Sequence, residues 1–260
     1  ESLIAAIQNG ANAIYLGGTL FNARAFAKNF DMDQLQWAVQ YAHLRNVKIY
    51  VTVNTLYKDD EFEQLIQYID QLYELQVDAL IIQDIGLFHI VKQRYPDFEI
   101  HISTQASVMN LYGVQYFEKM GANRVVLARE NSLEEIRHIC RNTTLDIEVF
   151  VHGALCVCYS GQCLMSSFIG KRSGNRGACA QPCRLQYRLV KDNEILENKV
   201  PFLLSPRDLM TIENIGELVD AGVTSFKVEG RMKKPEYVAS VIKAYRKAID
   251  AYLNREKDNF

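Results

Sequence analysis

Short apolar runs alternate with longer amphipathic stretches through residues 1–152. The short runs are rich in valine and isoleucine and end in glycine or polar residues, a pattern typical of buried strands. The longer stretches repeat apolar residues every three or four positions, which predicts helices with one buried face. This alternation favours βαβ units and a parallel sheet. We expect strands at 12–18, 47–55, 79–84, 99–105, 124–130 and 146–152, and helices at 33–45, 60–75, 85–94, 111–120 and 133–141.

A further strand is expected at 224–229, between a helix at 212–221 and a terminal helix at 235–253. A TIM-type (β/α)8 barrel has eight strands, and the pattern supplies seven. Because the first element is a helix at 2–9, we expect the first barrel strand before residue 1. The alternative is an open seven-stranded sheet, although no G-x-G-x-x-G follows a strand as a dinucleotide-binding fold requires. The sequence therefore predicts one α/β domain over 1–260, an incomplete TIM-type barrel.

Residues 153–200 interrupt this pattern. The first part, 153–184, is rich in glycine, serine, cysteine and arginine and has no apolar period. After it, 186–190 and 194–197 flank residues 191–193, a spacing typical of a β-hairpin. We predict a cysteine-rich loop followed by a hairpin, both inserted into the barrel domain.

Four of the six cysteines form the pattern C-x6-C-x15-C-x3-C at Cys156, Cys163, Cys179 and Cys183. Thiolates suit iron–sulfur clusters, zinc and Cu(I). Structural zinc sites favour two close cysteine pairs, and the last two cysteines form one such pair, so spacing alone leaves cluster and zinc both open. The remaining Cys140 and Cys158 are expected to be packing residues. Because disulfide frameworks belong to shorter secreted chains, we expect a reducing, cytoplasmic setting.

Charge is distributed unevenly along the chain. The net charge is −2, yet 149–191 contains no aspartate or glutamate. Arginine pairs with phosphate and stacks on bases, so this segment is a candidate for binding RNA or a carboxylate. The other interpretation is that the positive charges of this segment balance the negative charge of an anionic cluster. No apolar run is long enough to span a membrane. The candidate anion-binding residues are Lys171, Arg172, Arg176 and Arg184.

Active residues of barrels lie at the carboxyl ends of the strands, where this sequence is polar. His152 ends the strand that leads into the cysteine loop. Three roles are open for it: a proton donor, a substrate contact or a capping residue. Lys227 and Glu229 alternate with apolar residues, so we expect both to face the barrel interior and to pair. Arg231, just beyond that strand, suits an anionic substrate. These four residues are the catalytic candidates.

Motifs along nearly the whole chain resemble the U32 "peptidase" (collagenase-like) family. The most specific part is the cysteine segment, which reads EVFVHGALCVCYSGQC at 148–163 and RSGNRGACAQPCR at 172–184. Shorter motifs of the same kind are YLGG at 15–18, FNAR at 21–24, SPRDL at 205–209 and FKVEGR at 226–231.

This resemblance implies an oxygen-independent hydroxylase. Branches of the family hydroxylate carbon 5 of the tRNA wobble uridine, a cytidine of 23S ribosomal RNA, or the ubiquinone ring. The resemblance also implies a 4Fe-4S cluster on the four patterned cysteines, prephenate or a related metabolite as hydroxyl donor, RNA as partner, and a paralogous subunit in some cases. We therefore expect an RNA hydroxylase that forms 5-hydroxyuridine in tRNA, with the ribosomal cytidine as the alternative.

Two other functions are weighed against hydroxylation. The family's historical name suggests proteolysis, but Ser160 lacks a G-x-S-x-G context and no H-E-x-x-H occurs. A zinc-stabilised RNA-binding module without chemistry is the third hypothesis. Visible absorbance of anaerobically purified protein would separate a cluster from zinc, which is colourless.

Overall fold

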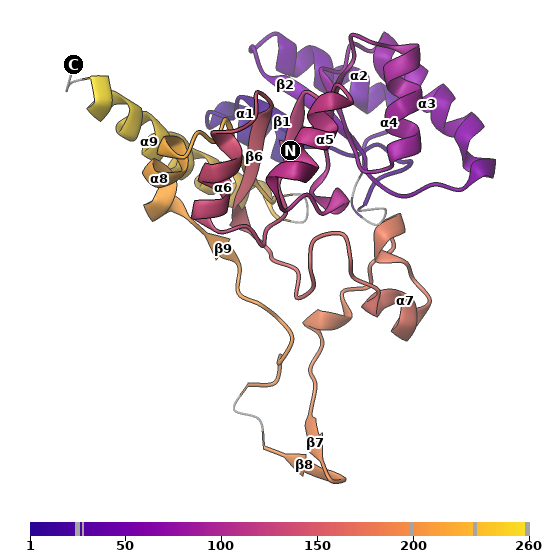
Figure 1. Ribbon diagram of the computed structural model, residues 1–260, viewed down its shortest axis with the longest axis vertical. Coiled ribbons are helices and arrows are strands. Elements are labelled where there is room, and N and C mark those ends of the chain that lie inside the picture. Colours follow the sequence, from indigo (N-terminus) through magenta and orange to yellow (C-terminus); the bar gives the residue numbers. More distant parts are fainter. Residues whose placement is uncertain (24–26, 28, 198–199, 231–232, 258–260) are drawn as a thin grey trace.

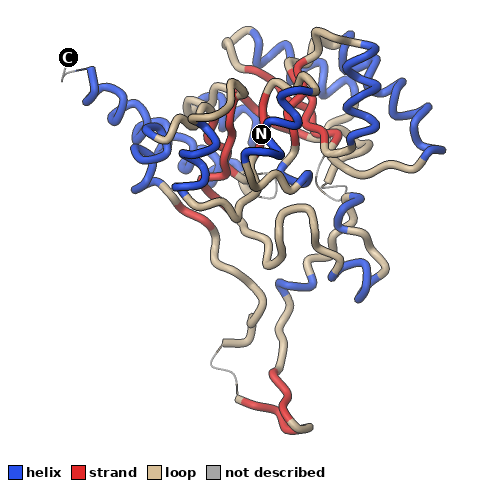
Figure 2. The backbone as a smooth tube through the Cα atoms, viewed as in Figure 1, coloured by secondary structure: helices blue, strands red, loops and turns tan. Residues whose placement is uncertain are grey.

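The computed structural model describes residues 1–23, 27, 29–197, 200–230 and 233–257. Seven parallel strands follow one another in the order β1-β2-β3-β4-β5-β6-β10, and helices connect them (Figures 1 and 2). Every predicted barrel strand is present; β6 extends one residue beyond its predicted range, and the other strands are shorter than theirs. The strands are β1 (Ala13–Leu16), β2 (Lys48–Val53), β3 (Ala79–Ile82), β4 (Glu99–Ile102), β5 (Arg124–Val126), β6 (Asp146–Gly153) and β10 (Ser225–Val228).

The helices also match their predicted positions. Ser132 caps α6 and Asp31 caps α2, each in a capping box that satisfies free amide groups of the first turn. The connecting helices are α1 (Ser2–Gln8), α2 (Met32–His43), α3 (Phe62–Glu74), α4 (Ile85–Arg94), α5 (Leu111–Lys119), α6 (Leu133–Cys140), α8 (Ile215–Asp220) and α9 (Pro235–Lys257). None of these described helices combines the length and apolar character needed to cross a bilayer.

The sheet is curled, as the barrel prediction requires. Its two outer parallel strands, β1 and β10, approach each other through side chains. The Tyr15 hydroxyl donates to the carbonyl of Val228 (3.4 Å), and the Lys227 ammonium lies 4.3 Å from the centre of the Tyr15 ring. Helix α1 packs against α9 on the outside of this junction. Within the described residues no backbone ladder joins the two strands, so the barrel is incomplete; an eighth strand upstream stays a prediction.

Both faces of the sheet are buried. On β2, Ile49, Val51 and Val53 face the helices and are fully buried in the main core, while Tyr50 faces the interior. Strands buried on both faces read as continuous apolar runs, which is why they were recognisable in the sequence.

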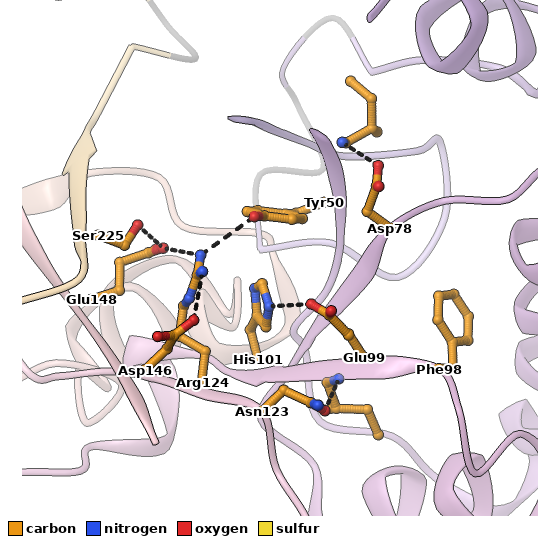
Figure 3. A network of polar contacts seen from close by, with 12 residues as sticks. Tyr50, Asp78, Phe98, Glu99, His101, Asn123, Arg124, Asp146, Glu148 and Ser225 are labelled. Atoms are coloured by element: carbon orange, nitrogen blue, oxygen red, sulfur yellow. Dashed lines mark hydrogen bonds and ion pairs between the residues drawn. The ribbon is translucent and has the colours of Figure 1, made fainter. Parts of the chain in front are cut away.

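The barrel interior is charged rather than aliphatic. Barrels usually fill this space with branched apolar side chains. Here the Glu148 carboxylate is buried and accepts hydrogen bonds from Lys227 (2.7 Å), Arg124 (3.3 Å) and Ser225 (2.7 Å), and Figure 3 shows the last two contacts. Burial alone would raise the pKa of Glu148, but Lys227 and Arg124 outweigh it and lower this pKa to about 2. Glu148 is therefore ionised and links β5, β6 and β10.

The insertion contains more structure than its sequence indicated. Helix α7 (Met165–Gly170) lies in the stretch without apolar period, and β9 (Leu209–Met210) pairs antiparallel with β6. Both were missed because elements this short carry no periodic signal. The predicted hairpin is confirmed as β7 (Leu189–Lys191) and β8 (Glu194–Leu196), and it projects away from the barrel (Figure 1).

We expect Glu148→Gln to lower the free energy of unfolding by about 3 kcal/mol, because it leaves the buried Lys227 charge without its counter-ion. The pKa of Glu148 is lower in the folded than in the unfolded chain. Its contribution is therefore present above about pH 4.5 and is lost as the pH falls from there towards 2. Urea denaturation across that window measures both effects.

Asp146→Asn is the matched control, because Asp146 also pairs with Arg124 but its side chain is 48% exposed. Its expected loss is below about 1 kcal/mol. Equal losses for the two variants would contradict a special role for the buried carboxylate.

Candidate active site at the mouth of the barrel

The cysteine segment 153–184 begins where β6 ends, at the carboxyl edge of the sheet. Gly153 has φ +110, and a side chain there would meet Glu229, so the two strand ends lie in close contact. The Glu229 amide donates to the carbonyl of His152 (2.9 Å). From this point the segment runs across the mouth and is held on two sides.

Ser160 fastens the first half of the segment to the ends of β4 and β5. Its amide donates to the Glu130 carboxylate (3.0 Å), and its buried hydroxyl contacts that carboxylate and accepts from the Arg129 amide (3.2 Å). The next residue, Gly161, has φ +74, and a Cβ there would overlap the carbonyl of Gln105. Only glycine allows the loop to approach this closely.

Arg176 fastens the second half to the ends of β2 and β3. Its guanidinium makes two contacts to Glu61 (2.7 and 3.0 Å) and one to the carbonyl of Leu56 (2.8 Å). These hydrogen bonds, together with the backbone of Lys58, lower the pKa of the Glu61 carboxyl. The Gln83 side chain adds a bond to the backbone of the same turn at 3.4 Å. We call the Arg176–Glu61 pair the latch.

The other candidate anion-binding residues also have partners within the protein. Arg184 donates to the carbonyls of Leu155 (2.6 Å) and Pro206 (2.8 Å), and so joins the start and end of the insertion. Arg172 donates to the carbonyl of Ala178 (3.1 Å). Lys171 is exposed and has a left-handed backbone conformation. The three arginines therefore stabilise the conformation of the segment. RNA contact by any of the four candidate anion-binding residues stays a prediction.

The segment gathers five thiols, all of them free. Burial raises the pKa of Cys183; Arg184 lowers it, and the neighbouring thiols of Cys156, Cys179 and Cys163 raise it further. Burial and the same neighbours, Cys163 and Cys156, raise the pKa of Cys158.

Cys140, in contrast, lies on α6 against Gly222, and burial raises its pKa to about 11, as expected of a packing residue.

These thiols form a donor set whose chemistry fits an iron–sulfur cluster. Thiolates are the usual ligands of such clusters, and the thiols of Cys156, Cys163 and Cys179 lie close enough to Cys183 to raise its pKa. Among the described residues, no three histidine, cysteine, aspartate or glutamate side chains are placed to coordinate one metal ion.

His152 lies behind the cysteine segment, between two tyrosine rings. Its Nδ1 is 3.4 Å from the Tyr245 hydroxyl, and its ring packs against Tyr237 and Tyr245. Burial lowers its pKa, Asp208 raises it and Lys233 lowers it, and the net shift is downward. His152 is therefore neutral near neutral pH. Arg231 lies outside the described residues.

The expected Lys227–Glu229 pair is wrong. The Lys227 ammonium instead contacts the Glu148 carboxylate inside the barrel, at 2.7 Å. The β10–β6 register shift lies beyond Lys227, where Val228 pairs with His152. Glu229 instead faces Arg129 at the end of β5, with 4.0 Å between Nη2 and Oε2.

Arg129 is a mouth residue that no sequence motif singled out. Its guanidinium lies 4.0 Å from the centre of the Phe150 ring. The sequence signal that could have identified Arg129 is its position among the polar residues that follow β5. The cysteine segment thus lies at the same edge of the sheet as Glu229 and Arg129. This is the edge where barrels carry out their chemistry.

Comparison with known proteins places this arrangement in a family. The model of Peptidase family U32 matches residues 1–260. The chain belongs to this family.

Curated relatives in the family carry different names. A protein of Bacillus subtilis (strain 168) named "tRNA hydroxylation protein P1" is 38% identical over the whole chain, which covers 63% of that protein. The "23S rRNA 5-hydroxycytidine C2501 synthase" of Escherichia coli (strain K12) is 42% identical over 97% of the chain and 38% of that protein. A "Collagenase" of Porphyromonas gingivalis (strain ATCC BAA-308 / W83) is 37% identical over 99% of the chain and 65% of that protein. The chain thus spans less than two thirds of the length of each of these relatives.

The latch predicts how accessible the thiols are. We expect Glu61→Gln to raise the alkylation rate of Cys179 in metal-free protein by up to about fivefold, because a partly exposed ion pair contributes up to about 1 kcal/mol. Mass spectrometry of the labelled peptide gives the rate. Glu63→Gln is the control, because Glu63 is exposed in the first turn of α3, directly after the turn that carries Glu61. Equal rates for the two variants would show that the latch does not hold the segment.

Proposed function

We propose that this protein is an RNA hydroxylase whose cysteine segment holds a 4Fe-4S cluster over the barrel mouth, and that its product is 5-hydroxyuridine at the tRNA wobble position. The observation that carries the proposal is the fastening of the thiol-bearing segment over the carboxyl ends of the strands. The relative named "tRNA hydroxylation protein P1" supports the choice of tRNA.

The cluster belongs to this proposal in full. Its ligands are Cys156, Cys163, Cys179 and Cys183, and Cys158 lies beside them as a neighbour. The bound cluster would supply electron transfer, the chemistry for which thiolate-held iron is suited. The protein's own part is to hold the thiols in place through Ser160 and the latch.

The mouth residues have separate parts in the proposed reaction. Hydroxylation converts C5–H to C5–OH, and the proposed donor, prephenate or a related carboxylated metabolite, gives up its hydroxyl oxygen and is reduced by two electrons as it takes the hydrogen in return. We assign to the half-buried His152 the transfer of a proton at Nε2. Glu229 contacts the base or the donor from the end of β10. Arg231 keeps its predicted role near an anionic group.

RNA binding is proposed for the exposed side of the insertion. Lys171, Arg172 and Arg176 are exposed, and no acidic residue occurs between 149 and 191 to oppose phosphate. A paralogous subunit and a cytoplasmic setting are part of the same proposal. The free state of all six cysteines supports a reducing compartment.

The ribosomal substrate is the second candidate. It is favoured by the 42% identity to the "23S rRNA 5-hydroxycytidine C2501 synthase". Both candidates are pyrimidines modified at C5, so one mouth geometry serves either base.

Serine proteolysis has no support from the position of Ser160. This hydroxyl is buried, contacts Glu130 and accepts from the Arg129 amide, so it is neither exposed to a peptide nor bonded to His152. Its contacts are those of a structural residue.

The ligand set predicts which cysteines retain iron. We expect each Cys→Ala variant at positions 156, 163, 179 and 183 to lose most of the iron and the broad visible absorbance after anaerobic reconstitution, because a cubane needs all four corners. Cys140→Ala and Cys158→Ala should keep both. Full iron content in one of the four variants would remove that residue from the set, with Cys158 as the first replacement to test.

The substrate is tested by nucleoside mass spectrometry of RNA from a deletion strain. We expect 5-hydroxyuridine to disappear from tRNA and to return when the full-length gene is restored. Loss of 5-hydroxycytidine from 23S RNA instead would select the second candidate. Persistence of every hydroxylated pyrimidine, in a strain without paralogues, would show that RNA is not the substrate.

A further inference from the structure

Arg129 and Glu229 form a pair at the mouth whose hydrogen-bonding capacity is unused. Their side chains are only 11% and 13% exposed. The contact between Nη2 and Oε2 is 4.0 Å, which is too long for a hydrogen bond. The Nε of Arg129 is buried and has no partner in the described part of the chain. Because this Nε has almost no exposed surface, the groups open to a ligand are the Arg129 amino groups and the Glu229 carboxylate, which lie beyond hydrogen-bond distance of each other.

The surroundings hold both groups in place. The amide of Arg129 donates to Ser160 (3.2 Å), and its guanidinium stacks on Phe150. The amide of Glu229 donates to His152 (2.9 Å), and its Cβ packs against Gly153. The two side chains therefore start from fixed backbone positions on neighbouring parts of the mouth, which is the preorganisation that a recognition site needs.

The interior charges differ from this pair. Lys227 and Glu148 approach to 2.7 Å, and Arg124 and Asp146 to 3.0 Å, so both pairs close to hydrogen-bond distance, although the Nε of Arg124 also has no partner in the described part of the chain. A purely structural Arg129–Glu229 pair would close to a similar distance. The longer separation leaves a donor and an acceptor side by side.

The charge balance selects the kind of ligand. The pair is neutral as a whole, so a free anion would gain from Arg129 but would be repelled by Glu229. A neutral group that offers an acceptor next to a donor satisfies both residues at once. Amide and imide edges have this arrangement, and pyrimidine bases carry it on their Watson–Crick edge.

We propose that Arg129 and Glu229 bind the Watson–Crick edge of the pyrimidine that is modified. Glu229 accepts from N3–H of uracil, or from the N4 amino group of cytosine, and Arg129 donates to the adjacent O4 or N3. This edge lies across the ring from C5 and C6, so the carbon to be hydroxylated is left free. The inference rests on the proposed function and adds to it the residues that recognise the base.

The first test uses the unaltered protein. Its affinity is measured for a synthetic RNA stem–loop with one unpaired uridine, and for the same RNA with 3-methyluridine or 2′-O-methyluridine at that position. We expect 3-methyluridine to weaken binding by about tenfold or more, because it removes the donor that Glu229 needs and leaves a buried carboxylate unsatisfied. The 2′-O-methyl nucleotide, whose base edge is intact, should bind as uridine does.

The second test alters the pair. Glu229→Leu removes the acceptor, and Arg129→Lys keeps the charge but removes the planar fork. Glu229→Leu should bind the uridine and 3-methyluridine RNAs with nearly equal affinity. Arg129→Lys should bind the uridine RNA more weakly than the unaltered protein does, while it keeps its general attraction to RNA. Asp146→Asn, in the interior network, should discriminate as the unaltered protein does. Thermal unfolding shows whether each variant is folded, and the first test stands if one is not.

The outcomes separate this inference from the function on which it rests. Equal binding of uridine and 3-methyluridine by the unaltered protein overturns the inference even if cellular RNA is hydroxylated. Retained discrimination in folded Glu229→Leu protein does the same. If Arg129→Lys instead raises only the concentration of prephenate needed for turnover, the pair binds the donor and the inference is wrong. Absence of any RNA hydroxylation in cells refutes the proposed function itself.

Discussion

The buried carboxylate of Glu148 is the interaction on which the rest of this structure depends. It accepts hydrogen bonds from side chains of β5 and β10 while belonging to β6. A parallel sheet without a closing ladder has two outer strands that must be held by side chains. Lys227 does this here, because its ammonium contacts Glu148 and also lies over the Tyr15 ring of β1. The charge inside the barrel thus helps to keep the curl that brings the strand ends to one mouth.

The same strand connects the interior to the candidate active site. Beyond Glu148, β6 continues through Phe150, which lies below the guanidinium of Arg129, to His152 and then to the cysteine segment. That segment leaves apolar residues such as Leu164, Phe168 and Ile169 exposed instead of burying them. Polar contacts therefore hold it to the barrel, through Ser160 on one side and Arg176 on the other. Such contacts are individually modest, and the segment can therefore be opened at less cost than the barrel core.

Membership of a family named for peptidases does not decide the chemistry of this site. Ser160 is committed to structural contacts, whereas five free thiols gather over the mouth and an unsaturated Arg–Glu pair lies at its edge. Function depends on the groups present at the site rather than on the fold that carries them. The proposed redox chemistry on a base rests on these groups rather than on Ser160.

The sequence by itself determined the order of strands and helices, the place of the insertion and the identity of the thiols. Runs such as Lys48–Val53 are apolar because both faces are buried, and cysteine spacing is read directly from the chain. Short elements such as the helix Met165–Gly170 were not predicted, because they are too short to show a period of apolar residues.

Only the tertiary structure decided which charges meet. The fold brings Lys227 to Glu148, Glu229 to Arg129 and Arg176 to Glu61, each pair across a long stretch of sequence. Contacts of this kind depend on distances in space between residues far apart in the chain. Local patterns of hydrophobic and polar residues carry no information about them.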